Sequence, residues 1–528
     1  MTQPRSSPGA GGSAGAEPLA SAPGRSPLTA VSGVWRKHRD LLDGASALAA
    51  TTGVTSLLGF AYWAFAARLF TPRAVGYGSA SVSAMTLLAL VGMLGLGTVL
   101  IGELPRRRPR AGLVSAALLA SGLGSLALGL AFAVAGPHVS EHFRNISRTP
   151  AQAGLFMAGV VLTAISLVFD QATIGLMRGK LQLTRNLIFA IAKLAALPAA
   201  AIVVMHDQFG AGITLSWVVG TAVSLLLVAA QLRVTGTRVL PGPDWRVLRS
   251  LGRTAVAHSW LNLAISIPRS LMPVLVTVVV SPAANAAFYA AWTLSGFLYI
   301  VPIHLATVLF AVASADPQKI ARKLRFSLGL SVAIGIPGMV ILGFGAHFAL
   351  SMFGPSYALA ATVPLLLLLI GYLPSIPKVH YIAVCRATGR ISRAATVLTI
   401  AAATEVVAAV AGGAAGGLDG LTLALVAVFV LEGLVTAPPV IRAAIGHGRH
   451  RRAAARPARD PAARAAQPPA HLPREYPRIS LSPADTARGR YARDREEEGV
   501  EVLLSLARSA GIDPVRPARP ARPLPPAW

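Results

Sequence analysis

Charged residues are scarce in this chain, and acidic residues are the scarcest of them. Only 13% of the 528 residues are Asp, Glu, Lys or Arg, whereas a soluble domain carries about 25%. The charged set holds 48 basic and 21 acidic residues, which gives a net charge of +27. Hydrophobic residues make up 54% of the chain. This composition excludes an ordinary soluble protein and indicates a membrane protein.

Motifs for redox chemistry and catalysis are equally few. The single cysteine, Cys385, cannot form a disulfide within the chain. The sequence HVSEH at His138–His142 matches a zinc-protease pattern, but it falls in a short predicted loop with no domain to complete a site. The sequence GLMRGK at Gly175–Lys180 lacks the first glycine and the final Ser or Thr of a phosphate-binding loop. We therefore predict no enzyme, no metal site, no cofactor and no ATP hydrolysis by the chain itself.

Long apolar runs recur between residues 46 and 442, and most reach the ~18–20 residues that cross a bilayer as a helix. They predict an all-α polytopic membrane protein with twelve transmembrane helices. We expect the tenth span to be irregular, because Pro374 and Pro377 break its end. The predicted spans are 46–69, 78–101, 112–136, 153–176, 186–205, 211–232, 255–280, 286–312, 327–352, 358–377, 394–412 and 420–442.

Basic residues gather in alternate loops between these spans. The loops after spans 2, 4, 6, 8 and 10 hold 20 Lys and Arg, whereas the loops after the odd-numbered spans hold 4 when Arg68, at the end of span 1, is included. By the positive-inside rule, this asymmetry places both termini in the cytoplasm. We expect a multi-pass protein of a bacterial-type cytoplasmic membrane. Because the membrane topology accounts for the positive charge, we predict no nucleic-acid partner.

Two stretches about half a chain apart share a pattern. The sequence DQATIGLMRGKLQLTRN (Asp170–Asn186) aligns with KVHYIAVCRATGRISRA (Lys378–Ala394) at an offset of 208 residues. This repeat predicts two parallel six-helix lobes with a site between them; chance similarity between apolar helices is the alternative. The predicted parts are a disordered arm at 1–43, an N-lobe at 44–235, a cytoplasmic linker at 236–254, a C-lobe at 255–442 and a basic tail at 443–528, where 482–511 can form a helix.

An arginine lies in the middle of the seventh span. Arg269 interrupts the apolar run LNLAISIPRSLMPVLV, and an arginine at the centre of a membrane helix costs roughly 2.5–3.5 kcal/mol. His258, Asn262, Ser266 and Arg269 share one face of a helix. We predict that this polar stripe lines a cavity between the lobes and that Arg269 binds an anion such as phosphate. An arginine held by a carboxylate or by backbone carbonyls is the alternative.

Four further charged residues lie inside or near other spans. Asp170 and Lys193 flank the loop between spans 4 and 5 at equal distances, which predicts a buried ion pair. A proton or sodium relay through Asp170 is the alternative. Glu405 and Glu432 can each carry a coupling proton or bond to a neighbouring helix.

Aromatic residues share faces of the first and eighth spans. Tyr62 lies on the first span, and Trp292 and Tyr299 lie on the eighth. Aromatic faces can stack on sugars in a cavity, and packing between helices is the alternative.

The run FAARLFTPRAVGYGSASVSAMTLLALVGMLGLGTVLIGELPR resembles the start of polysaccharide and O-antigen flippases. These belong to the multidrug/oligosaccharidyl-lipid/polysaccharide (MOP) exporter superfamily, and the link Asp170–Asn186 is similar to theirs. The resemblance covers about residues 44–442. It implies two six-helix lobes and alternating access of a central cavity. The first span has GFAYWAF where a lipid II flippase would place an Arg-Asp pair, which weakens a peptidoglycan-precursor interpretation.

The resemblance implies a flippase that moves an undecaprenyl-diphosphate-linked oligosaccharide to the outer leaflet for cell-surface polysaccharide or lipopolysaccharide biosynthesis. The expected partners are this glycan lipid, membrane lipids, and glycosyltransferases or a polymerase of the same pathway that bind the tail. Two alternatives remain. One is a cation-coupled multidrug antiporter of the same superfamily, and the other is a membrane scaffold that acts through its tail.

Overall fold

The computed structural model of the chain describes residues 52–105, 111–146, 148–204, 208–234, 242–315 and 320–446. At residues 145, 250–259, 311, 314 and 315 it describes the backbone alone. The predicted arm at 1–43, the start of the predicted linker and nearly all of the predicted tail, including 482–511, lie outside these ranges.

Every regular element in the described ranges is helical. A first helix covers residues 52–69. The others are α2 (Pro72–Gly92), α3 (Leu96–Glu103), α4 (Ala111–Val139), the 3-10 helix η1 (Glu141–Ile146), α5 (Pro150–Gly175), α6 (Gly179–Val203), α7 (Ala211–Val234), α8 (Trp245–Val279), α9 (Pro282–Ala315), α10 (Ile320–Phe344), α11 (Ala346–Ser351), α12 (Pro355–Ile370), α13 (Tyr372–Ala387) and α14 (Ile391–Ile445).

These helices confirm the predicted fold class. Among the described residues, nine helices are long and apolar enough to cross a membrane, and the bent pair α12 and α13 counts as a tenth span. The first predicted span corresponds to the helical residues 52–69. Each of the other predicted spans falls mainly on helical residues.

The 55 residues of α14 cover two predicted spans. Gly416 and Gly417 depart from helical geometry, and Gly417 has a φ of 59°, which favours glycine. On the two sides of this break, Gly412 and Gly420 approach so closely that a Cβ on Gly412 would lie 2.4 Å from the carbonyl oxygen of Gly420. The chain therefore reverses direction here, and the spans predicted at 394–412 and 420–442 form a helical hairpin.

Two predicted spans are broken helices. The second span divides into α2 and α3, because Leu94 and Gly95 both have positive φ. The tenth span bends by 49° between α12 and α13, at Gly371. The predicted end of this span at 377 is wrong. Helical residues continue to Ala387, because Pro374 lies in the first turn of α13, where no backbone N–H donor is needed, and Pro377 lies inside the helix without ending it.

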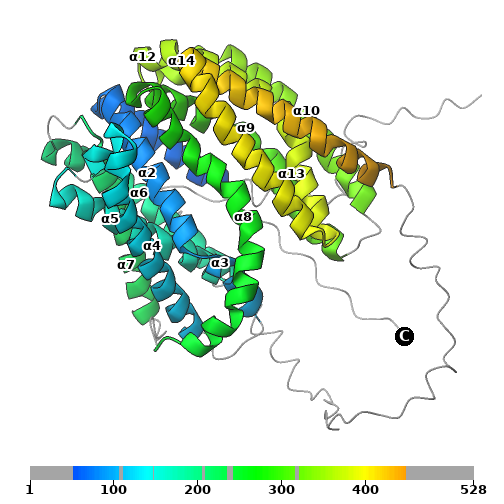
Figure 1. Cartoon of the computed structure of the whole chain (residues 1–528), viewed down its shortest axis with the longest axis horizontal. Helices are drawn as coiled ribbons and strands as arrows, with labels where there is room; N and C mark the ends of the chain where they lie inside the picture. Colours follow the sequence, from blue (N-terminus) through cyan, green and yellow to red (C-terminus); the bar gives the residue numbers. More distant parts are fainter. Residues whose placement is uncertain are drawn as a thin grey trace, which may run out of the picture. The chain divides into compact units, whose positions relative to one another are not determined.

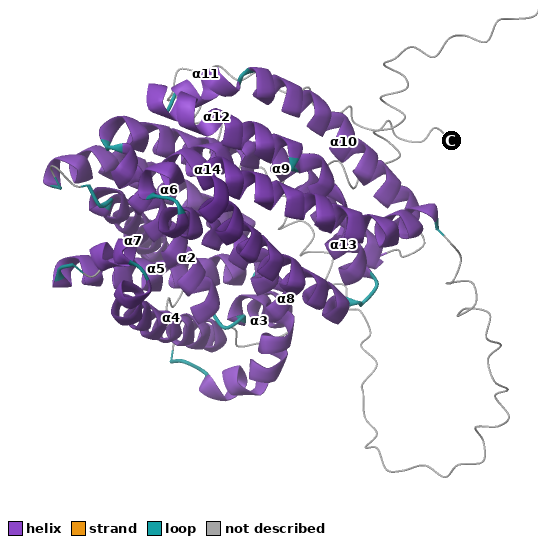
Figure 2. Cartoon of the chain, turned by 45° about the horizontal axis from the view of Figure 1, so that its top comes forward, coloured by secondary structure: helices purple, strands orange, loops and turns teal. Residues whose placement is uncertain are grey.

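We call the helices up to α7 the first half and α8–α14 the second half. In the first half, α4 packs on α5 and α6 packs on α7; in the second half, α9 packs on α10, α12 and α13. Two helices connect the halves. Helix α2 packs on α8 and α9 as well as on α5, and α8 packs on α2 and α3 as well as on α14. Figure 1 shows α8 in green between the blue helices and the yellow ones, and Figure 2 shows α3 beside it.

Candidate functional site

The polar stripe predicted on the seventh span lies on α8. This helix starts at an N-cap, Asp244, whose carboxylate accepts a hydrogen bond of 3.1 Å from the backbone N–H of Val247. Within the stripe, Asn262 and Ser266 are half-buried and Arg269 is exposed. The side chain of His258 lies outside the described residues.

Arg269 has an unusual environment for a charged residue in a membrane helix. Its side chain is exposed, although protein surrounds most of it at longer range. Within the described part of the chain it forms no hydrogen bond and no ion pair. Pro268, immediately before it, is buried inside the helix and removes one backbone hydrogen bond. The guanidinium is therefore available to an anionic group from outside the chain.

Asn262 connects the two halves of the molecule. Its amide nitrogen donates a hydrogen bond of 2.9 Å to Oγ1 of Thr98 on α3. Its amide oxygen accepts a hydrogen bond of 2.8 Å from Nη2 of Arg386, in the last turn of α13. The predicted spans place Arg386 in a basic loop, but the structure places it inside helix α13. Asn262, to which it bonds, precedes Arg269 by about two helical turns on α8.

The partner predicted for Asp170 is wrong. Both carboxylate oxygens of Asp170 accept hydrogen bonds from Arg185, of 2.9 Å from Nε and 2.7 Å from Nη2. The same guanidinium donates to Ser166. The error lies in the position of the turn: α6 begins at Gly179, so the turn is centred near Met177 and brings Arg185 to the depth of Asp170. Arg185 was assigned to the loop, and Lys193 lies more than two turns further along α6.

Lys193 is buried among aromatic rings. Its Nζ lies 4.1 Å from the ring centre of Trp217, 4.6 Å from that of Phe189 and 4.7 Å from that of Tyr62. The faces of these rings carry the negative part of the aromatic quadrupole and attract the ammonium group. The structure thus places a cation inside the first half with aromatic rings in place of the predicted carboxylate.

The three aromatic residues proposed to line a cavity pack between helices. Tyr62 is fully buried, and its hydroxyl lies 2.7 Å from Oγ of Ser216. Trp292 stacks on Phe288, and the hydroxyl of Tyr299 donates a hydrogen bond of 3.0 Å to the carbonyl of Leu368. The packing alternative therefore describes these residues in this conformation, because the hydroxyls of Tyr62 and Tyr299 and one face of Trp292 are already engaged.

Glu405 and Glu432 share one partner, Lys378. Nζ of Lys378 on α13 donates hydrogen bonds of 2.6 Å to Oε1 of Glu405 and 2.8 Å to Oε2 of Glu432. The two glutamates lie on opposite arms of the α14 hairpin, so the cluster joins three consecutive spans. Sequence reasoning placed Lys378 in a loop, because Pro374 and Pro377 suggested that the span had already ended.

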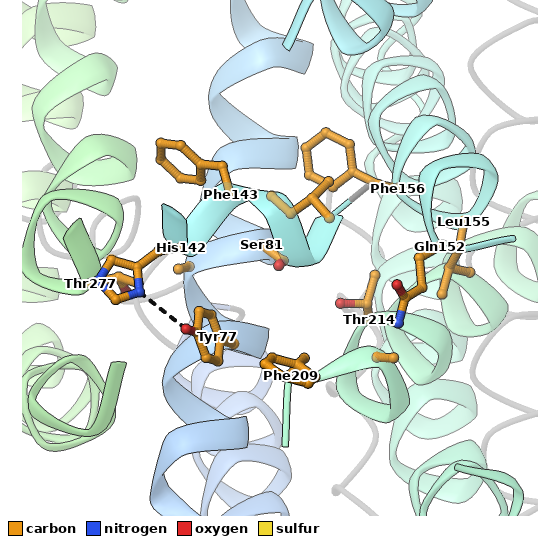
Figure 3. A pocket seen from close by; sticks show the side chains of 13 residues that line it. Tyr77, Ser81, His142, Phe143, Gln152, Leu155, Phe156, Phe209, Thr214 and Thr277 are labelled. Carbon is orange, nitrogen blue, oxygen red and sulfur yellow. Dashed lines mark hydrogen bonds between the residues drawn. The ribbon is translucent and has the colours of Figure 1, made fainter. Parts of the chain in front are cut away.

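A pocket lies beside the N-terminal half of α2 (Figure 3). Tyr77, His142, Gln152, Phe209 and Thr277 are among its lining residues. The hydroxyl of Tyr77 lies 3.1 Å from Nδ1 of His142, which belongs to the HVSEH sequence. Among the described residues, no group of three or more His, Cys, Asp or Glu is placed to hold a metal ion.

Comparison with known sequences gives no assignment: no protein-family model matches the chain, and no curated protein matches it. Solved structures do match. A multidrug resistance MATE family transporter of the MOP superfamily, in an inward-facing conformation, superposes with a TM-score of 0.57 at 16% identity over 74% of this chain and 95% of that chain. An outward-facing MATE family transporter gives a TM-score of 0.53 at 15% identity over 77% and 96%.

A third match comes from Pyrococcus furiosus. It is a MOP superfamily transporter whose binding pocket has reverse polarity, which suggests a different function for that protein, and it superposes with a TM-score of 0.51 at 15% identity over 77% of this chain and 96% of that chain. Identities this low establish the fold alone. The chain therefore has the MATE-like fold of the MOP-superfamily transporters, as the resemblance of residues 44–442 predicted.

Proposed function

We propose that this chain is a flippase that exports an anionic lipid-linked glycan, with the charge of an undecaprenyl-diphosphate carrier, from the inner to the outer leaflet. The observation that carries this proposal is Arg269. It is an exposed guanidinium at mid-span in α8, with no partner among the described residues, on the helix that packs against both halves. Guanidinium donates two parallel hydrogen bonds to a phosphate, so a diphosphate fits this position.

The distribution of carboxylates disfavours the multidrug antiporter. A cationic drug would need an acidic residue that is free to bind it. Asp170, Glu405 and Glu432 are each bound to a cation of the chain itself, namely Arg185 or Lys378. The unpaired charge on α8 is positive, and the bound carboxylates lie within the halves. Scaffolding alone would give no reason for an unpaired arginine at this depth.

The membrane potential supports outward movement of such a cargo. An inside-negative membrane favours the exit of negative charge by roughly 2.3 kcal/mol per charge per 100 mV. A diphosphate that crosses with its charge intact would gain this energy without ATP. Arg269 would lower the cost of the charged group at the centre of the bilayer, where the cost is highest.

The test is transport of lipid-linked glycan in membrane vesicles, measured as its appearance in the outer leaflet. Arg269→Ala should reduce transport roughly tenfold or more, because a charge-assisted hydrogen bond contributes about 1.5–3 kcal/mol. Arg269→Lys should retain part of it, because the charge stays and the forked geometry is lost. Arg233→Ala, at an exposed arginine in the last turn of α7, is the matched control and should transport normally.

Two results would contradict the proposal. Full glycan transport by a folded Arg269→Ala protein would remove the role of this arginine. Export of cationic dyes by the unaltered protein, without glycan transport, would instead support the antiporter.

A further inference from the structure

The cluster of Lys378, Glu405 and Glu432 has an unbalanced charge. If all three groups are ionised, one ammonium faces two carboxylates, and a net negative charge remains within the second half. The side chains of the two glutamates are only 5% and 7% exposed. A buried charge without compensation costs several kcal/mol. Neutrality requires one additional positive charge at the cluster.

One carboxylate oxygen of the cluster lacks a hydrogen-bond donor, which indicates where the additional positive charge would bind. Oε2 of Glu432 accepts a hydrogen bond from Lys378, but Oε1 is buried and has no hydrogen-bond partner among the described residues. Buried carboxylate oxygens are nearly always hydrogen-bonded. A proton on the glutamate pair would neutralise the cluster and would supply the missing donor. Two carboxylates that contact the same ammonium repel one another, and a shared proton relieves this repulsion.

A proton fits this site better than a metal ion. The ammonium of Lys378 already occupies the position between the carboxylates, at 2.6 and 2.8 Å from their oxygens, and would repel a second cation of larger size. Nearby titratable groups are engaged elsewhere. Tyr299 of α9 donates to the carbonyl of Leu368, and His380 of α13 bonds to Ser327 of α10 and to the carbonyl of Ile376.

Charged groups on the other packed helices also bond elsewhere or stay apart. Arg325 of α10 donates to the carbonyl of Ala444, and Tyr372, in the first turn of α13, donates to the carbonyl of Ser331. Arg269 of α8 forms no bond to either glutamate. The ring of Phe429 covers one side, at 5.8 Å from Nζ of Lys378. None of these groups therefore supplies the missing positive charge.

The cluster is mechanically tied to the bend in the tenth span. Lys378 lies two turns after Gly371, where α12 and α13 meet at 49°. Pro374 on α13 touches the turn that carries Glu432 so closely that a Cβ on Gly433 would lie 2.6 Å from the carbonyl oxygen of Pro374. A change in the attraction between Lys378 and the glutamates must therefore act on the orientation of α13, which also carries Arg386 and its bond to Asn262.

We propose that Glu405 and Glu432 hold one exchangeable proton between them, and that its release to water repositions α13 during transport. Release leaves the pair doubly ionised around Lys378, and uptake of a proton from the other side of the membrane restores neutrality. This inference concerns the driving ion and rests on the transporter fold. It does not depend on the identity of the cargo.

The experiment counts protonated carboxyl groups in the purified full-length protein in lipid nanodiscs, by infrared spectroscopy of the carboxylic C=O band with a deuterium-shift check. We expect one protonated carboxyl at neutral pH in the unaltered protein, and none in Glu432→Gln or Glu405→Gln. Lys378→Met should hold two, because both glutamates must then be neutral. Asp419→Asn, at an exposed acid on α14, should leave the band unchanged.

Each variant is first checked for cooperative thermal unfolding, and any one folded variant of the three decides the question. The proposal is overturned if the unaltered protein shows no protonated carboxyl at neutral pH, or if the band survives in a folded Glu432→Gln or Glu405→Gln variant. It is also overturned if sodium ions, at constant pH, displace the proton signal or replace it as the stabilising ion. Because no glycan is present, failure here is separate from failure of the proposed cargo.

Discussion

Asp170 and Arg185 are fifteen residues apart and face one another across the turn between α5 and α6, joined by hydrogen bonds of 2.9 and 2.7 Å. The arginine side chain is 5% exposed and that of the aspartate 15%. A pair so well shielded has given up most of its hydration, and each charge depends on the other. It joins the fourth and fifth spans and engages both oxygens of the carboxylate.

Breaking this pair should destabilise the first half. Asp170→Asn and Arg185→Met should each lower stability by about 3–5 kcal/mol, because each leaves one buried charge without its partner. The double variant should recover part of the loss, since no charge then remains. Thermal unfolding of the detergent-solubilised protein measures the effect. If the same coupling appeared between Asp170→Asn and Lys193→Met, the assignment of Arg185 as the partner would be contradicted.

The charge of Lys193 should be dispensable for folding. Its amine lies among three aromatic rings without a carboxylate, and an unbranched apolar side chain of similar length can fill the same space. Lys193→Met should therefore unfold at the same temperature as the unaltered protein or a higher one, because it removes the cost of a buried charge. Lys180→Met, at an exposed lysine in the first turn of α6, is the control. A clear fall in unfolding temperature for Lys193→Met alone would mean that the cation stabilises the cage.

The contrast between these residues shows what the sequence could predict. The membrane spans follow from hydropathy, since a bilayer requires long apolar helices whatever their neighbours. The pairing of Asp170 depended instead on where the turn lies. Arg185 lies near the start of helix α6. Its charge lowers the local hydropathy, so the sequence alone suggests that it belongs to a loop. Hydropathy alone cannot recognise a cation that is neutralised inside the protein.

For the same reason, two bonded basic residues of the second half could not be recognised from the sequence. Lys378 and Arg386 were assigned to a cytoplasmic loop, yet both lie in α13 and bond to residues that are distant in sequence. The polar stripe on α8 could be predicted, because helical periodicity is local. Its contacts with Thr98 and Arg386 could not, because they depend on how separate helices pack. The role of Arg269 as an anion site stays a prediction.

The bridge through Asn262 should control the distance between the halves. Asn262→Val removes the hydrogen bonds to Thr98 and Arg386 and keeps a side chain of comparable bulk. Spin labels at Lys180 and Thr388, in a Cys385→Ala background, should then report a longer mean distance or a broader distribution. Ser266→Val, one turn further along α8, has no such bridge to lose and serves as the control. An unchanged distribution in Asn262→Val would show that the bridge does not hold the halves together.

The orientation predicted from the basic loops can be tested with the same background. A cysteine at Ala283, next to the start of α9, should react with a membrane-impermeant maleimide applied to intact cells. A cysteine at Thr388, after α13, should react only after the membrane is opened. Both positions are exposed in the structure, so access to the reagent depends on the side of the membrane. The reverse pattern would invert the topology and place the cluster of basic loops outside.

The contact between α2 and α9 at Gly76 should tolerate no added atom. A Cβ on Gly76 of α2 would lie 1.6 Å from the carbonyl oxygen of Pro282 at the start of α9, and the amide of Asn285 donates a hydrogen bond of 2.8 Å to the carbonyl of Gly76 at the same place. Because the atoms that a Cβ on Gly76 would meet belong to the backbone of Pro282, a rotamer change cannot relieve the clash, and the two helices would have to separate.

Gly76→Ala should therefore lower stability by at least the ~1–3 kcal/mol typical of overpacking, and it should lengthen the distance between labels on the two halves at this end. Gly59→Ala is the matched control, because a Cβ there meets nothing within 4 Å and alanine favours the helix. Thermal unfolding of the two variants side by side gives the comparison. Equal unfolding temperatures would mean that α2 and α9 can move apart freely, and that the halves are held together at the Asn262 bridge instead.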